Sequence, residues 1–256
     1  MPVMEFVDIN CCVGPYYNPP PGLDWSAAGL LARMDDLGIA EACVAPLMGR
    51  DYDPWMSNVW LSENVPPSPR LHRMWTAAAH HSAEFPPPDA LLEGMRRHNV
   101  CLLRLCLYAE AYVSRLDVPI FAELFDALAQ HRVPILLDCS GALTLGATEL
   151  EPVLQRWPDM PVVLSVAKIV QHDRWLYYLW EHYSNLYVDL PGYQCLGGTE
   201  AVVQRFGAER LLFGSRYPYF TPLQSMLQVV YADIDDAAKW AIAGGTARRL
   251  LSEVTL

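Results

Sequence analysis

Three cations, two carboxylates and a thiol follow the ends of short apolar runs in this chain. Arginine and lysine at such places hold carboxylate or phosphate groups by charge-assisted hydrogen bonds, and a carboxylate can carry a proton. The polar residues at these ends are Asn10, Cys12, Arg104, Asp138, Lys168, Asp189, Arg216 and Tyr217. If the ends meet in space, the cations form a site for an anionic ligand. The alternative is that they only neutralise Asp138 and Asp189.

The segment 6–14 shows how a single strand could deliver several of these groups. With a period of two, Asp8, Asn10 and Cys12 lie on one face, and the apolar or thiol side chains at 7, 9, 11 and 13 lie on the other. Buried polar groups are costly without partners. We therefore expect the polar face to point into a cavity where other side chains meet it.

Eight short apolar runs are followed, in nearly every case, by a segment with helical spacing. The expected strands are 6–14, 40–46, 71–79, 100–107, 133–138, 161–166, 185–189 and 210–214. The expected helices are 25–37, 88–98, 119–131, 149–157, 173–183, 198–206, 222–231 and 235–251. Continuously apolar strands are typical of a parallel sheet covered on both faces. The sequence predicts an α/β fold, a single-domain (β/α)8 TIM barrel over residues 1–256, with the polar residues at one mouth.

Two features bear on this prediction. A doubly wound open sheet would have a Gly-rich first turn, and Gly14-Pro15-Tyr16-Tyr17 is not one. The segment at about 49–70 is rich in tryptophan and proline, so we expect an excursion with at most a brief helix. Its Trp55 and Trp60 could cover an aromatic ligand or pack in the core.

The composition limits the possible partners. A net charge of -11 argues against nucleic acids and anionic membranes, because both attract basic surfaces. The first residues lack the pattern of a signal peptide, and the apolar stretches are too short to span a membrane. Seven cysteines without a C-x-x-C pair favour reduced thiols in a cytoplasmic protein. We expect a small-molecule ligand and, given the apolar content, a possible homodimer.

Three motifs resemble the amidohydrolase superfamily. They are Asp8-Ile9-Asn10-Cys11-Cys12, Leu212-Phe213-Gly214-Ser215-Arg216-Tyr217-Pro218 and Ile242-Ala243-Gly244-Gly245-Thr246-Ala247-Arg248-Arg249-Leu250-Leu251. More narrowly, they resemble its amidohydrolase-related branch, which includes metal-dependent hydrolases and decarboxylases acting on small carboxylated rings. The resemblance covers nearly the whole chain and implies a TIM barrel with its site at the mouth.

The family pattern has metal ligands where this chain has other residues. It has Asp-x-His-x-His in the first strand, His at the ends of the fifth and sixth strands, and Asp in Gly-Ser-Asp-Tyr-Pro after the eighth. This chain has Asn10, Cys12, Asp138, Val166 and Arg216 at these positions. Two like unit charges 4 Å apart repel by about 4 kcal/mol at an effective dielectric constant near 20, and a divalent ion doubles this. We therefore expect a degenerate metal site and no cofactor, with Arg216 pairing with Asp138 or holding a substrate anion.

These observations imply a metal-independent amidohydrolase-like protein that binds a small carboxylated or cyclic ligand and hydrolyses or decarboxylates it. The expected catalytic residues are Asp138 as proton carrier, Arg216 as stabiliser of negative charge, and Cys12, which is either a nucleophile or a filler of the space a histidine would take. The expected substrate-binding residues are Asn10, Arg104, Lys168, His172, Asp189 and Tyr217. Two alternatives remain open. One is a non-catalytic relative that senses a ligand or supports a partner subunit, and the other is a metal hydrolase with unusual ligands.

Overall fold

The computed structural model describes residues 4–16, 22–107, 116, 118–139, 145–166 and 174–256. Its eight parallel strands are β1 (Phe6–Val13), β2 (Ile39–Pro46), β3 (Leu71–Ala77), β4 (Val100–Cys106), β5 (Ile135–Cys139), β6 (Val162–Val166), β7 (Leu186–Asp189) and β8 (Leu211–Leu212). They pair in chain order. A bridge between Cys11 and Tyr217, with a 3.0 Å bond from the N–H of Ile9 to the C=O of Phe213, brings the last segment back to β1. The barrel is nearly closed, and the predicted single-domain TIM barrel is confirmed.

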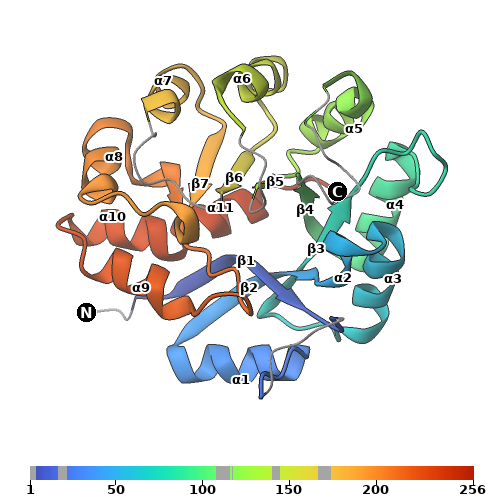
Figure 1. Cartoon of the computed structure of the whole chain (residues 1–256), viewed down its shortest axis with the longest axis horizontal. Coiled ribbons are helices and arrows are strands. Elements are labelled where there is room, and N and C mark those ends of the chain that lie inside the picture. Colours follow the sequence, from blue (N-terminus) through green and yellow to red (C-terminus); the bar gives the residue numbers. More distant parts are fainter. Residues whose placement is uncertain (1–3, 17–21, 108–115, 117, 140–144, 167–173) are drawn as a thin grey trace.

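Helices surround the strands (Figure 1). They are α1 (Ala27–Leu37), α2 (Met48–Asp51), α3 (Pro54–Asn64), α4 (Pro88–His98), α5 (Val118–Gln130), α6 (Ala147–Arg156), α7 (Arg174–His182), α8 (Gly198–Phe206), α9 (Pro222–Val230), α10 (Asp236–Trp240) and α11 (Thr246–Ser252). The helix expected at 235–251 is interrupted by a π-helical turn, Ala241–Gly245. This turn packs Gly244 so closely on β1 that a Cβ there would lie 2.7 Å from Cγ2 of Val7. Among the described residues, no helix has both the length and the apolar character to cross a membrane.

The barrel interior is filled from alternate positions of the strands. The strand residues that fill the interior are Val7, Ile9, Cys12, Cys43, Ala45, Met74, Leu102, Leu136, Val163, Tyr187 and Leu212. Side chains two residues apart in a strand point the same way. Arg104, Asp138, Ser165 and Asp189 each follow an interior residue by two, and therefore face the interior at the carboxyl ends of their strands.

Strand β1 departs from strict alternation. Its register against β2 shifts between Asp8 and Cys11. As a result, Ile9 and Cys12 both pack in the barrel interior, whereas Cys11 packs in the layer between strands and helices. We expected residues 7, 9, 11 and 13 to share one face, and this prediction is wrong beyond Ile9. An irregularity of this kind changes which face the following residues occupy.

The Trp- and Pro-rich segment is more helical than expected. It contains α2 and the eleven-residue α3, which begins with Asp53 as N-cap and Pro54 in its first turn. The side-chain amide of Asn58 joins α3 to β3: Nδ2 donates to the C=O of Thr76 at 2.8 Å, and Oδ1 accepts from its N–H at 2.7 Å. A Cβ on Gly49 would lie 2.5 Å from Oγ1 of Thr76, so glycine lets α2 approach the same strand end. The expected brief helix was wrong because capping and this amide pair stabilise a longer one.

Candidate functional site

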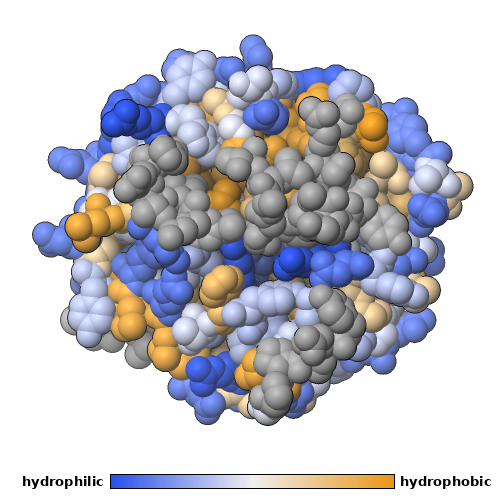
Figure 2. Space-filling model, in the orientation of Figure 1, coloured by the Kyte–Doolittle hydropathy of each residue, from blue (hydrophilic) through white to orange (hydrophobic). Residues whose placement is uncertain are grey.

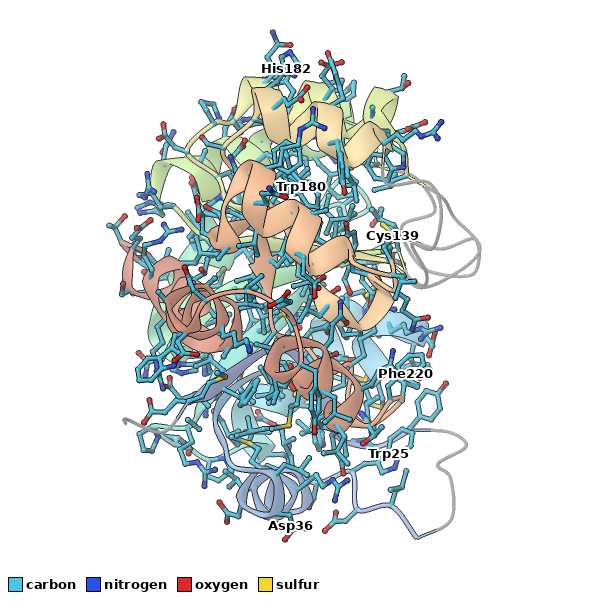
Figure 3. All side chains as sticks on the ribbon, turned by 90° about the vertical axis from the view of Figure 1, so that its left-hand side faces the viewer. Trp25, Asp36, Cys139, Trp180, His182 and Phe220 are labelled. Atoms are coloured by element: carbon cyan, nitrogen blue, oxygen red, sulfur yellow. The ribbon has the colours of Figure 1, made fainter. Side chains whose placement is uncertain are left out.

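A cavity of about 320 Å³ opens at the carboxyl ends of the strands. We call it the mouth cavity. It is lined by Asn10, Cys12, Arg50, Arg104, Arg216, Tyr219 and Phe220. Figure 3 shows Phe220, Trp25 and Cys139 toward one end of the barrel, and Cys139 is the last residue of β5. Hydrophilic residues gather at the centre of this face (Figure 2). Three guanidinium groups thus converge on one hollow.

Arg104 reaches the mouth cavity from β4 and is held by two neighbours. Its Nε donates to Oδ2 of Asp138 at 2.9 Å, its Nη2 donates to the same oxygen, and its Nη1 donates to Sγ of Cys12 at 2.7 Å. Arg104 is 3% exposed and Asp138 is fully buried. Separating a buried, hydrogen-bonded ion pair is costly, because it leaves a buried charge without its partner. The pair therefore fixes the orientation of both groups. Arg104 therefore presents a fixed positive edge to the cavity.

Arg216 follows β8 with a left-handed backbone, at φ 55°. Its Nε and Nη2 donate to Oγ of Ser165 at 3.0 and 2.7 Å, and Nη2 also donates to the C=O of Val166 at 2.5 Å. The left-handed region costs a non-glycine residue about 1 kcal/mol or more. A 2.8 Å bond from the N–H of Arg216 to the C=O of Asn10 helps to offset this strain. The expected pairing of Arg216 with Asp138 was wrong, because Arg104 takes that carboxylate.

A buried polar chain lies beside Arg216. The Nδ2 of Asn10 donates to Oγ of Ser165 at 2.9 Å and to Oδ2 of Asp189 at 2.8 Å, and Ser165 donates to the same carboxylate oxygen at 2.6 Å. Burial raises the pKa of Asp189, although the charge of Arg216 and these two hydrogen bonds oppose the rise. Among the described residues, Oδ1 of Asn10 and Oδ1 of Asp189 are buried with no hydrogen-bond partner. Asn10 therefore keeps one acceptor unused at the wall of the cavity.

Asp8 holds the loop that carries Arg216. Its Oδ1 accepts from the N–H of Ser215 at 2.9 Å and from the N–H of Asn10 at 3.1 Å. Complete burial raises the pKa of Asp8 to about 6, and hydrogen bonds from Cys11 and Ser215 oppose this rise. Asp8 thus links β1 to the segment after β8, which indicates a structural role.

Cys12 lines the mouth cavity, and its thiol has little nucleophilic character. Burial raises the pKa of its thiol, and the nearby charge of Arg104 only partly opposes this. A thiol is a good nucleophile only when deprotonated. The environment therefore favours the space-filling role for Cys12 over the nucleophilic one.

The structure separates the expected site residues into three groups. The mouth cavity receives Asn10, Cys12, Arg104 and Arg216. Asp138 and Asp189 lie outside its lining, and the phenol of Tyr217 instead donates to the C=O of Asp24 at 3.5 Å. Lys168 and His172 lie outside the described residues.

Sequence reasoning missed Arg50, Ser165, Tyr219 and Phe220. The alternation of β6 could have identified Ser165, which stands two residues after the interior Val163. Arg50 and Tyr219 come from segments outside the strands, where no periodicity marks them. The one local signal is Gly49, whose missing Cβ permits the close approach that brings α2 over the mouth.

The described residues at the mouth do not form a binding site for a metal ion. Within the described part of the chain, no group of three or more His, Cys, Asp or Glu side chains could hold one. Asp138 and Asn10, which stand at two of the family's ligand positions, are engaged with Arg104 and Ser165. A dication here would lie near the guanidinium groups of Arg104 and Arg216, which repel it. The lining fits an anion better than a cation.

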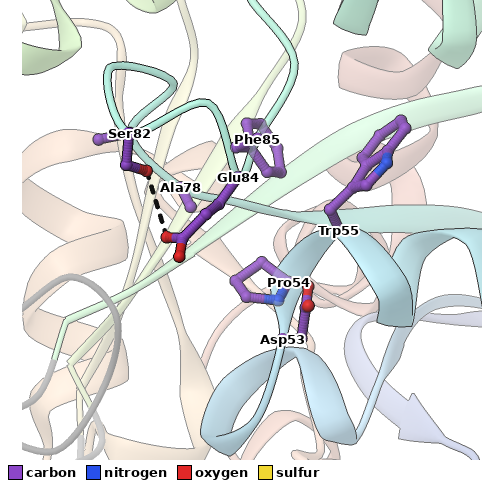
Figure 4. A pocket seen from close by; sticks show the side chains of 8 residues that line it. Asp53, Pro54, Trp55, Ala78, Ser82, Glu84 and Phe85 are labelled. Carbon is purple, nitrogen blue, oxygen red and sulfur yellow. Dashed lines mark hydrogen bonds between the residues drawn. The ribbon is translucent and has the colours of Figure 1, made fainter.

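A second, smaller cavity of about 160 Å³ lies between the start of α3 and the segment after β3 (Figure 4). Its lining contains two carboxylates, Asp53 and Glu84. Asp53 accepts from the N–H of Met56 at 2.9 Å, and Glu84 accepts from Oγ of Ser82 at 3.2 Å. These bonds give the carboxylates roles in capping α3 and shaping the loop.

Gly192 should be essential for the position of Arg216. A Cβ at this residue would lie 1.8 Å from the C=O oxygen of Val166, which accepts a hydrogen bond from Arg216. We expect Gly192→Ala to displace that carbonyl and lower the free energy of unfolding by about 1–3 kcal/mol, as overpacking does. Urea denaturation measures this. Gly146→Ala is the control, because its nearest neighbour is the flexible Glu149 carboxylate at 3.3 Å, and equal losses in both variants would contradict the expectation.

Three solved structures show the same fold. An uncharacterised TIM-barrel protein from Bordetella bronchiseptica is 18% identical over 97% of this chain and 99% of that chain, with a TM-score of 0.73. The 5-carboxyvanillate decarboxylase from Sphingomonas paucimobilis is 14% identical over 99% and 100%, with a TM-score of 0.69. A proposed 2-pyrone-4,6-dicarboxylic acid hydrolase from Pseudomonas putida is 15% identical over 99% and 100%, with a TM-score of 0.72.

The family of this chain is identified by comparing its sequence with family models and not by the solved structures. No curated protein gives a sequence match to the chain. The family model described as amidohydrolase, however, matches residues 16–252. This span includes β2 to β8 and the motif after β8 that carries Arg216. The chain therefore belongs to the amidohydrolase family.

Proposed function

We propose that this protein binds a small carboxylated, cyclic ligand at the mouth cavity without a metal ion, and hydrolyses or decarboxylates it. One observation carries the proposal: the guanidinium groups of Arg104 and Arg216 face one cavity together with Asn10. The reaction class is supported by the neighbours, which by name include a decarboxylase of 5-carboxyvanillate and a proposed hydrolase of 2-pyrone-4,6-dicarboxylic acid.

The floor of the cavity, formed by Asn10, Arg104 and Arg216, is suited to hold a carboxylate. Arg104 and Arg216 are 3% and 5% exposed, so water screens their charges poorly. Their bonds to Asp138 and Ser165 fix them before a ligand arrives. A fixed donor gains more from an anion than a flexible one, because less side-chain entropy is lost on binding.

The same groups could assist the reaction. In hydrolysis or decarboxylation, negative charge develops on the substrate, and preorganised guanidinium groups stabilise it. Asp189 is better suited than Asp138 to hold a proton, because its pKa is raised by burial whereas Asp138 is ion-paired with Arg104. Ser165 donates to Oδ2 of Asp189 and accepts from Arg216, so a proton on Asp189 would be carried by its other oxygen, Oδ1.

A second candidate function is ligand sensing without turnover. It is favoured by the position of Asp138 and Asp189, which both lie outside the lining of the mouth cavity. A general acid or base must come within hydrogen-bond reach of the substrate, directly or through one water. Turnover of small lactones and aromatic carboxylates separates the two candidates.

Arg216→Gln tests the proposal. We expect it to weaken binding of benzoate about tenfold or more, because a charge-assisted hydrogen bond contributes about 1.5–3 kcal/mol. Arg156→Gln is the control, since Arg156 is exposed at the end of α6 and pairs with Asp126 at 3.8 Å. Isothermal titration calorimetry measures both.

Two results would contradict the proposal. Equal benzoate affinity in the parent and Arg216→Gln would show that Arg216 does not hold the anion. Stoichiometric zinc that survives dialysis against a chelator, with binding or turnover lost when it is stripped, would show that a metal acts at the site.

A further inference from the structure

Helix α9 exposes apolar side chains on the side where a surface helix ordinarily carries polar ones. The residues that it buries are Pro222, Ser225 and Val229. Leu223, Leu227 and Val230 lie on its outer side and are 41%, 49% and 42% exposed. Residues at this spacing form one stripe along a helix. A helix that is apolar on its outer as well as its inner side is normally covered on both, so we expect this stripe to meet a partner.

The exposed apolar surface extends beyond the helix. Gln228 of α9 donates to the C=O of Tyr193 at 2.9 Å and to Oγ1 of Thr199 at 3.2 Å. Leu196 lies between these two residues in the chain and is fully exposed. We use the name α9 face for the exposed side chains of Leu196, Phe220, Leu223, Leu227, Val230 and Tyr231. Apolar residues are visible over α9 in Figure 2, at the place that Figure 1 gives for this helix.

The area of the α9 face is large enough for a stable interface. The exposed fractions of its side chains together correspond to more than three whole side chains. A large side chain has an area of roughly 150–250 Å², so the face exposes roughly 600 Å² of apolar surface. A stable interface buries about 800 Å² on each partner, of which about 60% is apolar. The α9 face therefore supplies the apolar area that such an interface requires.

The charge of the chain favours a second copy as the partner. No charged residue occurs between Tyr217 and Tyr231, whereas the whole chain has a net charge of -11. Two copies therefore repel each other over most of their surfaces, and this repulsion is weakest where both faces are uncharged. A partner with an acidic or a basic surface finds no complementary charge on the α9 face. An uncharged apolar face is complementary to itself, as a two-fold interface requires.

We propose that the α9 face is the interface of a homodimer with two-fold symmetry. The stripe of Leu223, Leu227 and Val230 packs against the same stripe of the second copy, and the side chains around it enlarge the contact. Because the stripe follows helical spacing, two such helices can interlock their side chains along their length. This inference does not depend on the proposed function, since it uses neither a ligand nor the arginines of the mouth cavity.

Sedimentation equilibrium of the parent and of Leu227→Glu tests the proposal. We expect the parent to dimerise, and Leu227→Glu to weaken the dimer about a hundredfold or more, because a two-fold interface contains the substitution twice. Leu227 is exposed, so the variant should keep the fold, which circular dichroism checks. Ile120→Glu is the control and should dimerise like the parent, since Ile120 is 41% exposed on α5, away from α9 (Figure 1).

A mixture of Leu227→Glu and Leu227→Lys shows whether the α9 face meets itself. Opposite charges in the two copies should restore part of the association that either variant loses alone. A mixture that does not associate would show that the face packs against a different surface, and would overturn the proposal. A monomeric parent, a Leu227→Glu variant that dimerises like the parent, or an equal loss in Ile120→Glu would overturn it as well.

Discussion

Asp138→Asn is expected to lower the free energy of unfolding by about 3–5 kcal/mol, the usual cost of breaking a buried ion pair. The substitution preserves shape but removes the negative charge beside the guanidinium of Arg104, which is 3% exposed. A buried charge without compensation is far more costly than a buried neutral group. Because a whole protein is stable by only about 5–15 kcal/mol, urea denaturation at pH 7 should show a large shift of the midpoint.

The double variant Arg104→Met with Asp138→Leu distinguishes charge from packing. Replacing both members of a buried pair by apolar residues is often neutral, whereas replacing one is not. We therefore expect the double variant to recover most of the stability lost in Asp138→Asn, while ligand binding stays weak. A double variant as unstable as the single one would show that the pair acts mainly by filling space.

Asp8→Asn is expected to flatten part of the dependence of stability on pH. The pKa of Asp8 is about 6 in the folded protein and 3.8 for the reference carboxyl group. Between these values the folded state keeps a proton that the unfolded state has released, so stability falls as pH rises. A shift of this size corresponds to roughly 3 kcal/mol, lost progressively from about pH 4 to pH 6.

The difference between the parent and Asp8→Asn isolates this contribution from the other carboxyl groups. Asparagine retains an oxygen that can accept from the N–H groups of Ser215 and Asn10, so the fold should survive. Urea denaturation of both proteins from pH 4 to pH 7 gives the difference in stability, which should change by roughly 3 kcal/mol in favour of the variant. Asp159→Asn, at an exposed carboxylate, should follow the parent, and a difference that is independent of pH would contradict the burial of a titrating Asp8.

The barrel could be predicted from the sequence because its strands differ in pattern from the segments around them. Continuous apolar runs such as β5 and β6 are buried on both faces, and each is followed by a segment of helical spacing. The helices α4 and α8 begin and end where the sequence predicts, since turns and caps mark both ends. The helical spacing of 235–251 does not mark the π-helical turn before α11, where Gly244 packs against Val7 of the distant strand β1.

The site was only partly predictable, for a similar reason. Strand-end position brought Arg104 and Arg216 to the mouth as expected, because the fold alone fixes the ends of parallel strands. The partner of each arginine depends on the direction of its side chain and on the register of its strand. A shift of one residue along the strand changes both. Asp138 therefore pairs with Arg104 and not with Arg216. Arg50 was missed because α2 reaches the mouth through tertiary contacts alone.

The amide of Asn58 makes the same two bonds to Thr76 that a neighbouring strand would make. These bonds hold α3 to the end of β3. The short connection that carries α2 therefore lies between two fixed elements, β2 and α3. Moving the start of α3 away from β3 would break two buried hydrogen bonds. We therefore expect α2, which carries Arg50, to keep its position at the mouth cavity when a ligand enters.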